Sequence, residues 1–523
     1  MNGWLTVSPI LTPLVTAALC MVFWRWPVVQ RVLSLAGALV LTILSGLLMS
    51  VVMDDGIQVV QMASWAAPFG ITLVADPLAA LLVWISSVMA LCVAIYSLGD
   101  IDPVREQGGF HAIFQVLMVG VCGAFITGDV FNLYVWFEVM LISSFVLLSL
   151  GGTREQIDGA VKYVGINLVA TTCLLLAVAL LYGVTGTLNM ADLAVRLPQV
   201  ANQGLVSTIA VLFIIAFGMK AALFPFFAWL PAAYHTPAVT VQAIFAGLLT
   251  KVGVYALIRM FTLIFTGDQP WTHGILLWLA GLTMITGVLA SLAVRNLQRA
   301  WSWQVVAHIG SMVMGLAIAT PLALAAASFY LVHDIVVKTN LFLGAGVVRR
   351  LAGGSADYDR LGGLFKAAPW FCILLFIPMA SLAGFPPLSG FWGKLMLVQA
   401  GLGAGNYVIV GALLLTGLLT FWLVGRVWVE MIWKRAPEEG TTSLEEMPAA
   451  RSYPLVFPLL LLSIITVAIG LRPEPLANAV TRVAESLSDP ATYVDAVLGP
   501  AASQPTLIGG LHAEEDAGGE GME

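Results

Sequence analysis

The sequence predicts an all-α integral membrane protein with about fourteen transmembrane helices. The prediction depends on an apolar composition, a series of long apolar runs, and a one-sided distribution of basic residues. Of the 523 residues, 60% are hydrophobic and 10% are charged, and the mean hydropathy is +0.95. A soluble globule cannot bury this much apolar surface, so lipid is the expected solvent.

Runs of roughly 20 apolar residues, long enough to cross a bilayer as a helix, recur along the chain. The first run has no basic residue before it and no small-residue cleavage site after it, so we expect it to stay as an anchor. The expected spans cover residues 4–23, 32–52, 77–98, 111–126, 130–150, 160–181, 206–230, 240–263, 275–294, 302–320, 322–347, 369–400, 407–431 and 455–471.

Basic residues gather on one side of these expected spans. With the N-terminus outside, the cytoplasmic loops hold Arg25, Arg31, Arg105, Arg154, Lys162, Arg295, Arg299, Arg349, Arg350, Arg360, Lys366, Lys434, Arg435 and Arg451. Only Arg196, Arg472 and Arg482 then lie outside. Because lysine and arginine favour cytoplasmic loops, we expect an even number of spans and external termini.

The remaining segments offer little room for a soluble domain. We expect an N-terminal unit of three spans at residues 1–110, a cytoplasmic linker at 432–454, the last span at 455–471 and an external tail at 472–523. The acidic, glycine-rich stretch around Glu514 is expected to be disordered. The five cysteines stand singly in apolar runs, so we expect no metal, iron–sulfur or haem cofactor and no disulfide.

Two spans contain helix breakers at membrane depth, Pro225 in the seventh and Pro386 with Pro387 in the twelfth. Broken helices inside a membrane are tolerated where they line water-filled cavities or transport sites. Lys220 precedes the first break and Lys394 follows the second. We therefore expect two inverted five-helix repeats, spans four to eight at residues 111–263 and spans nine to thirteen at 275–431.

Charged side chains inside the expected spans are the candidate functional residues, because each costs about 2.5 to 3.5 kcal/mol at the bilayer centre. Glu138 lies among apolar residues, and Lys220, beside the first break, is its expected partner. Lys251 lies in the middle of the eighth span, where Gly247 leaves room for water or a neighbouring helix. The simpler alternatives are a partner-only role for Glu138 and a lysine that fills a kink at position 220.

Histidines and a further ion pair extend this series. His308 shares a helix face with Gln304 and Ser311, although it is also consistent with an ordinary core histidine. Asp334 and Lys338 are four residues apart in the order that favours an ion pair, and a static salt bridge is the simpler alternative. His333 adds a group that titrates near neutrality.

Four segments resemble the antiporter-like subunits of Mrp-type cation/proton antiporters, respiratory complex I and membrane-bound hydrogenases. They are FNLYVWFEVMLISSF, FGMKAALFPFFAWLPAAYHTPAVTVQAIFAGLLTKVGVYALIR, HDIVVKTNLFLGAG and LAGFPPLSGFWGK. The resemblance covers nearly the whole chain. It implies that Glu138 and Lys220 form a coupled pair, that Lys251 and Lys338 with His308 form a central proton relay, and that Lys394 is the exit residue.

Lys394 and the HDIVVKTNLF segment are most similar to the D-type subunits of Mrp sodium/proton antiporters. This similarity implies partner subunits A, B, C, E, F and G, protons and Na⁺ as transported ions, a bacterial plasma membrane, and no nucleic-acid partner. Asp334 stands where many relatives have a second histidine, so the resemblance gives His333 no definite role.

Three other functions are consistent with parts of this pattern. The nearest is a redox-driven subunit of complex I or a hydrogenase, which has the same relay. A structural membrane subunit would use its buried charges only to hold helices together. An organic-solute transporter fits less well, since the charges form a series and not a ring around a pocket.

Overall fold

The structure is a computed structural model that describes residues 3–65, 69–435 and 449–500. The described chain has twelve helices long and apolar enough to cross a membrane, together with two shorter apolar helices. The shorter ones, Phe110–Ile126 and Pro369–Ala383, lie where the fourth and twelfth spans are expected. The all-α membrane architecture is therefore confirmed.

The first spans are α1 (Gly3–Val22), α2 (Pro27–Asp55) and α3 (Pro77–Asp100). The next group consists of α5 (Phe110–Ile126), α6 (Val130–Ser149), α7 (Arg154–Thr185), the pair α9 (Gln203–Ala221) and α10 (Trp229–Ala233), and a continuous helix of α11 (Val239–Ile244), η4 (Phe245–Leu249), α12 (Thr250–Arg259) and η5 (Met260–Ile264).

The second half of the bundle also consists of long helices. Its members are α13 (Gln269–Ala293), α14 (Leu297–Ile318), α15 (Pro321–Leu351), the pair α17 (Pro369–Ala383) and α18 (Ser389–Gly403), and α19 (Tyr407–Trp428) continued by η7 (Val429–Trp433). The last long helix is α20 (Ala449–Leu471).

Polar side chains at the helix starts explain several of these boundaries. Asp76, Asp129, Thr153, Asn296 and Thr320 each accept a hydrogen bond from a backbone N–H in the first turn of α3, α6, α7, α14 and α15. Such caps satisfy donors that a helix cannot pair internally. The membrane helices are thus delimited by local chemistry as well as by their apolar length.

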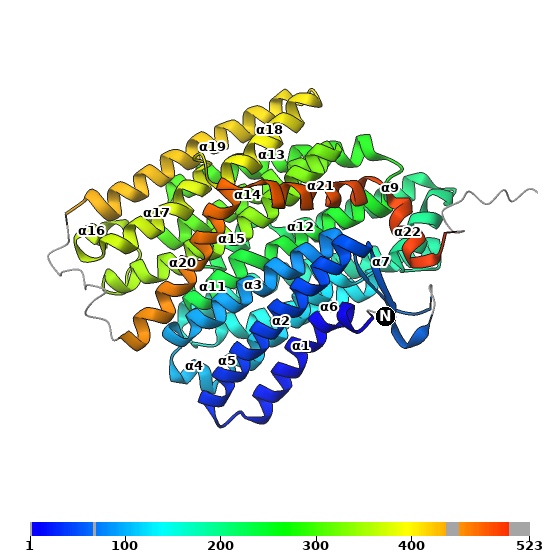
Figure 1. The fold of residues 1–523 in the computed structure, drawn as a ribbon. Helices are drawn as coiled ribbons and strands as arrows, with labels where there is room; N and C mark the ends of the chain where they lie inside the picture. Colours follow the sequence, from blue (N-terminus) through cyan, green and yellow to red (C-terminus); the bar gives the residue numbers. More distant parts are fainter. Residues whose placement is uncertain (1–2, 66–68, 436–448, 501–523) are drawn as a thin grey trace, which may run out of the picture.

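Short elements lie at the two ends of the helix bundle (Figure 1). The first end, here called the strand end, holds the antiparallel strands β1 (Gln58–Gln61) and β2 (Thr72–Ala75) together with α8 (Met190–Arg196) and α22 (Pro490–Leu498). The opposite end holds α4 (Pro103–Gln107) and α16 (Leu364–Ala367). Both α1 and α22 contact β1, so the two ends of the described chain lie on the same face.

Residues 474–498, which the sequence assigns to an external tail, form two helices. Val480, Val483, Ala484 and Leu487 make one apolar face of α21 (Glu474–Ser488), which packs on α15 and α3. The prediction missed this amphipathic helix because it is too short and too polar to resemble a span. Glu514 and most of the linker at 432–454 lie outside the described residues.

Each end of the bundle contains a matching loop contact. At the strand end, Asp129 before α6 forms a short antiparallel bridge with Asn189 after α7. At the opposite end, Asn296 before α14 forms the same kind of bridge with Asp357 after α15. The two bridges therefore occupy corresponding places in the two groups of helices but opposite faces of the molecule.

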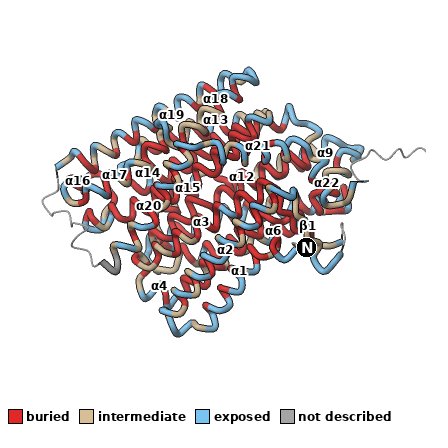
Figure 2. The backbone as a smooth tube through the Cα atoms, viewed as in Figure 1, coloured by how far each residue is buried: buried red, intermediate tan, exposed pale blue. Residues whose placement is uncertain are grey.

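Helix α15 lies in the centre of the core. Every residue from Ala323 to Val348 is buried, and α14, α17, α18, α20 and α21 pack around it. Figure 2 shows the buried interior running the length of the bundle, with exposed residues concentrated on the outer helices such as α18 and α19. Asp334 and Lys338 on α15 are consequently shielded from lipid by other helices.

Candidate functional site

Asp334 on α15 is the centre of a buried ionic cluster. Its Oδ2 lies 2.7 Å from Lys251 Nζ on α12, and its Oδ1 lies 2.8 Å from His308 Nδ1 on α14. Lys338, one turn along α15, is farther away, with its Nζ 3.9 Å from Oδ1. The side chains of Lys251, Asp334 and Lys338 are all inaccessible to solvent. One carboxylate thus serves three basic groups from three helices.

The spacing in the sequence predicted an ion pair between Asp334 and Lys338, and the structure contains this pair at 3.9 Å, but the Lys251 ammonium lies closer to the carboxylate. Spacing along one helix identifies only neighbours on that helix, whereas the closer ammonium comes from α12. Among the described residues, Lys338 Nζ has no hydrogen-bond acceptor. Lys338 is therefore the least tightly held member of the cluster.

A π-helical turn positions Lys251. The segment η4 (Phe245–Leu249) is π-helical, and Lys251 Nζ donates a hydrogen bond of 2.6 Å to the Ala246 carbonyl within it. A Cβ on Gly247 would overlap the Thr339 hydroxyl, so this glycine lets η4 approach α15 closely. The space expected beside Gly247 is thus filled by a neighbouring helix. Single π turns are common at functional sites.

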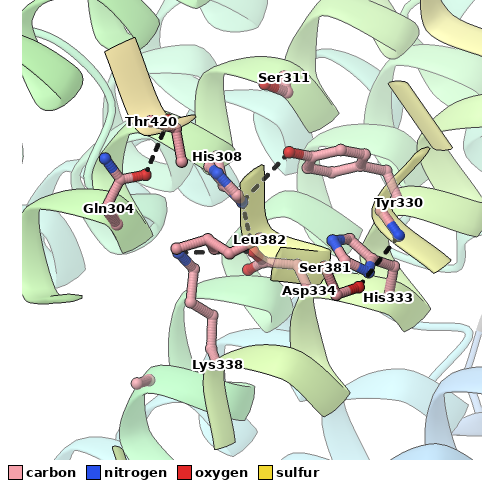
Figure 3. A network of polar contacts seen from close by, with 12 residues as sticks. Gln304, His308, Ser311, Tyr330, His333, Asp334, Lys338, Ser381, Leu382 and Thr420 are labelled. Carbon is pink, nitrogen blue, oxygen red and sulfur yellow. Dashed lines mark hydrogen bonds and ion pairs between the residues drawn. The ribbon is translucent and has the colours of Figure 1, made fainter. Parts of the chain in front are cut away.

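His308 connects Asp334 to a phenol. The Tyr330 hydroxyl lies 3.1 Å from His308 Nδ1, and Figure 3 shows the imidazole between Tyr330 and Asp334. The predicted polar stripe of Gln304, His308 and Ser311 is entirely buried on α14. Tyr330 was not among the residues predicted from the sequence, although it precedes Asp334 by four residues and so lies on the same helix face.

His333 packs against Tyr330 and forms its hydrogen bond at the second helix break. Its Nδ1 lies 2.9 Å from Ser389 Oγ, which lies 3.0 Å from Ser381 Oγ. The Gly390 N–H in turn donates to Ser381 Oγ over 3.2 Å. His333 therefore links α15 to the junction of α17 and α18, and both serines were missed from the sequence.

Lys394 binds the C-terminal carbonyls of α17. Its Nζ donates to the carbonyls of Leu382 and Ala383, over 2.8 and 3.0 Å. Helix α17 is followed by its cap residue Gly384, whose φ of +89° suits glycine. The last carbonyls of a helix have no internal hydrogen-bond donor and carry partial negative charge. The Lys394 ammonium supplies hydrogen bonds to two of these carbonyls and a positive charge beside them. Pro386 and Pro387 follow at the break, as predicted.

Lys220 has a similar place at the first break. It lies in the last turn of α9, before Ala222 with a φ of +62° and before Pro225. Its Nζ donates 2.9 Å to the Thr171 hydroxyl on α7. It also lines a cavity of about 20 Å³, which is room for roughly one water molecule.

Glu138 and Lys220 form no ion pair within the described residues. Glu138 Oε1 is buried without a hydrogen-bond partner, and the Lys220 ammonium lies 5.5 Å from the ring centre of the neighbouring Phe137. The sequence named Lys220 as the expected partner of Glu138, and in the structure the Lys220 ammonium donates its hydrogen bond to Thr171.

Several ion pairs lie outside the predicted series, including one at each end of the bundle. At the strand end, Arg259 Nη2 lies 2.7 Å from Asp76 Oδ1, with both side chains buried. At the opposite end, Arg31 binds both oxygens of Glu106 at 2.6 and 2.7 Å. Burial acts to raise the pKa of Glu106, but hydrogen bonds from His111 and Arg31 outweigh it and lower this pKa to about 2.

Comparison with known proteins places the chain in a family. The model of the family "NADH:quinone oxidoreductase/Mrp antiporter, TM" matches residues 127–420. The chain is 40% identical to the D-type subunit of the Na⁺/H⁺ antiporter of Alkalihalophilus pseudofirmus, over 94% of this chain and 99% of that one. It is 39% identical to the corresponding subunit of Bacillus subtilis, over 95% and 100% of the two chains.

Solved structures have the same fold. A chain of the Mrp complex from Dietzia sp. superposes with a TM-score of 0.86 and 28% identity, covering 95% of this chain and 100% of that one. A chain of an archaeal membrane-bound sulfane sulfur reductase gives a TM-score of 0.85 and 26% identity, with 94% and 100% covered. The chain therefore belongs to the D-type subunits of the Mrp sodium/proton antiporters, within the membrane-subunit family shared with NADH:quinone oxidoreductase.

Proposed function

We propose that this antiporter subunit translocates protons for an Mrp-type sodium/proton antiporter complex along a buried relay. The relay consists of Glu138, Lys220, Lys251, His308, His333, Asp334, Lys338 and Lys394. The observation that carries the proposal is the sharing of one buried carboxylate, Asp334, by Lys251, His308 and Lys338. As a member of an antiporter family, the subunit is a transporter and not an enzyme.

Competition for Asp334 supplies the switching step. A single carboxylate neutralises the charge of one ammonium. In the structure, Asp334 lies closer to Lys251 than to Lys338. When Lys251 loses its proton, the negative charge of Asp334 is free to pair with Lys338. This pairing stabilises the protonated form of Lys338. Two like charges about 10 Å apart at an effective dielectric near 20 repel by roughly 1.7 kcal/mol, more than a tenfold change in proton occupancy.

The remaining groups carry the proton between the two breaks. Glu138 sets the charge state of Lys220, which lines a cavity with room for about one water molecule. His308 and Tyr330 extend the central cluster, while His333 and Ser389 connect α15 to the second break. Lys394, held by the carbonyls of α17, releases the proton when Lys338 becomes charged.

The two groups of helices are inverted repeats in this proposal, residues 111–263 and 275–431, and fourteen spans cross the membrane. Three correspondences support the repeats. Each group has a helix that ends in a left-handed residue just before proline, at Ala222 and Gly384. Each ends in a π-helical turn, η5 or η7. The loop bridges at Asp129 and Asn296 occupy opposite faces.

The proposal places the strand end outside a bacterial plasma membrane, together with both chain ends. The one-sided basic residues support this orientation, since Arg31, Arg105 and Lys434 lie toward the opposite end. Partners are the other Mrp subunits, A, B, C, E, F and G. The structure of the Mrp complex from Dietzia sp., which contains a chain of this fold, supports such an assembly.

A structural subunit is the second candidate, because Asp334 also ties three helices together. The two functions make different predictions for Glu138→Gln and Lys220→Met in everted membrane vesicles. The relay predicts loss of Na⁺-dependent proton movement with normal amounts of assembled complex. A purely structural role predicts reduced assembly, and whatever complex remains would transport normally. Lys162→Met is the matched control, since Lys162 pairs with Asp158 on the exposed surface.

A further inference from the structure

Helix α12 carries a polar stripe that leads from Lys251 to the strand end. Lys251, Tyr255 and Arg259 follow at intervals of four residues, so they lie on one helix face over about 12 Å of helix. Their side chains are at most 3% exposed. Such a stripe is costly inside a membrane protein unless its groups are paired or functional. The relay between the two helix breaks uses only its first member.

The middle member of the stripe is fixed by hydrogen bonds. The Tyr255 hydroxyl donates 2.7 Å to the Phe125 carbonyl at the end of α5, and it accepts a longer hydrogen bond of 3.4 Å from Arg259 Nη2. Side chains four apart on a helix are about 5 to 6 Å apart at their Cβ atoms. Single water molecules can bridge such gaps between polar groups.

The end of the stripe is a buried ion pair with unfilled hydrogen-bonding capacity. Arg259 Nη2 lies 2.7 Å from Asp76 Oδ1, which also caps α3 through the Ala79 N–H. Asp76 Oδ2 and Arg259 Nε are both buried without a partner among the described residues. Buried polar atoms of this kind are usually satisfied by ordered water. The pair therefore provides a site for water at the strand end of the stripe.

A segment from the far end of the chain closes this site. Tyr493 on α22 places its ring 5.1 Å from the Arg259 guanidinium carbon, and it is 2% exposed. Because arginine stays protonated, the covered guanidinium is a fixed positive charge that repels passing cations. The ring shields the pair from bulk solvent, and a shielded pair holds more tightly than a fully hydrated one.

We propose that the Asp76–Arg259 pair, covered by Tyr493, is the gate of a proton half-path between Lys251 and the strand end. Opening requires α22 to lift Tyr493 and water to reach Asp76, Tyr255 and then Lys251. The proposal rests on the proposed function, because it takes Lys251 as a proton carrier. It adds a route to one face that does not pass through Lys394.

The test measures passive proton leak in everted vesicles, as the decay of an imposed pH gradient without Na⁺. Tyr493→Ala should speed the decay by roughly three- to thirtyfold, the change expected for losing one buried cation–π contact, and Asp76→Asn, which breaks the buried ion pair, should speed it at least as much. Tyr493→Phe keeps the ring and should not leak. Val494→Ala is the matched control, since Val494 is buried on the same helix. Results are normalised to assembled complex.

Adding Lys251→Met to Tyr493→Ala should abolish the leak, because the path then lacks its inner carrier. The gate is overturned if neither Tyr493→Ala nor Asp76→Asn leaks, if Val494→Ala leaks equally, or if the leak survives Lys251→Met. Antiport by Lys251→Met alone separates the two proposals. Its retention would remove the proposed function, whereas its loss together with a tight Tyr493→Ala variant would remove only the gate.

Discussion

The Lys251 ammonium lies 2.7 Å from the Asp334 carboxylate, and neither side chain is accessible to solvent. Each charge offsets the desolvation cost of burying the other, because a lone charge in this interior would have no water to solvate it. Asp334 also reaches His308 at 2.8 Å and Lys338 at 3.9 Å. The pair is therefore a structural contact between α12 and α15. In the proposed relay it is also the place where Lys251, His308 and Lys338 compete for one carboxylate.

Removing one partner of this pair should harm assembly more than removing both. Asp334→Asn leaves Lys251 and Lys338 without a counter-charge, and breaking a buried pair typically costs about 3 to 5 kcal/mol. Lys251→Met combined with Asp334→Asn removes the pair and should recover much of the assembled complex on native gels. Transport should stay absent in both variants. A double variant that assembles no better than Asp334→Asn would contradict the pairing.

Tyr330 should tune the relay through His308. Tyr330→Phe removes the hydroxyl 3.1 Å from His308 Nδ1 while keeping the ring. Loss of one such hydrogen bond is worth about 1 kcal/mol, so the antiport rate should fall roughly fivefold and its pH profile should shift. Ser328→Ala on the same helix is the control, because its hydroxyl donates to the Leu324 carbonyl, outside the cluster. An unchanged pH profile would exclude Tyr330 from the relay.

The antiport rate should depend on the Thr171 hydroxyl. Thr171→Val removes the acceptor 2.9 Å from Lys220 Nζ at nearly constant shape, whereas Thr171→Ser retains it. Leaving a buried ammonium without this partner costs about 1 to 3 kcal/mol, so the antiport rate should fall in Thr171→Val and persist in Thr171→Ser. Equal rates in the two variants would show that Lys220 finds its partner elsewhere.

Acid should selectively weaken the contact between Arg31 and Glu106. The pKa of Glu106 is about 2 in the folded protein, below its ordinary value, so the stabilisation is complete above about pH 4.5 and is lost as the pH falls toward 2. Glu106→Gln should lower the melting temperature of the detergent-solubilised complex at pH 7. Its deficit relative to the unmodified protein should shrink as the pH falls below 4.5. A constant deficit would contradict the assignment.

Much of the fold could be predicted because apolar length is a local property. Each of the fourteen expected spans corresponds to a helix or a pair of helices, and the breaks at Pro225 and Pro386 lie where the proline positions placed them. Helix α21 was missed because its apolar face includes only one or two residues per turn, such as Val480 and Leu487. Amphipathic helices of this length carry no signal comparable to a continuous apolar run.

The candidate site was predicted by residue but not by contact. Glu138, Asp334 and the lysines were identifiable because charge is rare in apolar helices. Their partners depend on which helices lie side by side, as the closer approach of Lys251 than of Lys338 to Asp334 illustrates. Hydroxyl groups such as Thr171 and Ser389 are common in membrane helices, so nothing local distinguished them.

The central claim is that Lys338 carries protons and does not merely neutralise Asp334. It is tested most directly by Na⁺-dependent proton movement in everted vesicles containing matched amounts of assembled complex. The control is Lys162→Met, which removes a lysine with the same four-residue spacing to an aspartate on the surface. The relay predicts that Lys338→Met abolishes the Na⁺-dependent signal and that Lys162→Met retains it. Retained antiport in Lys338→Met would contradict the relay.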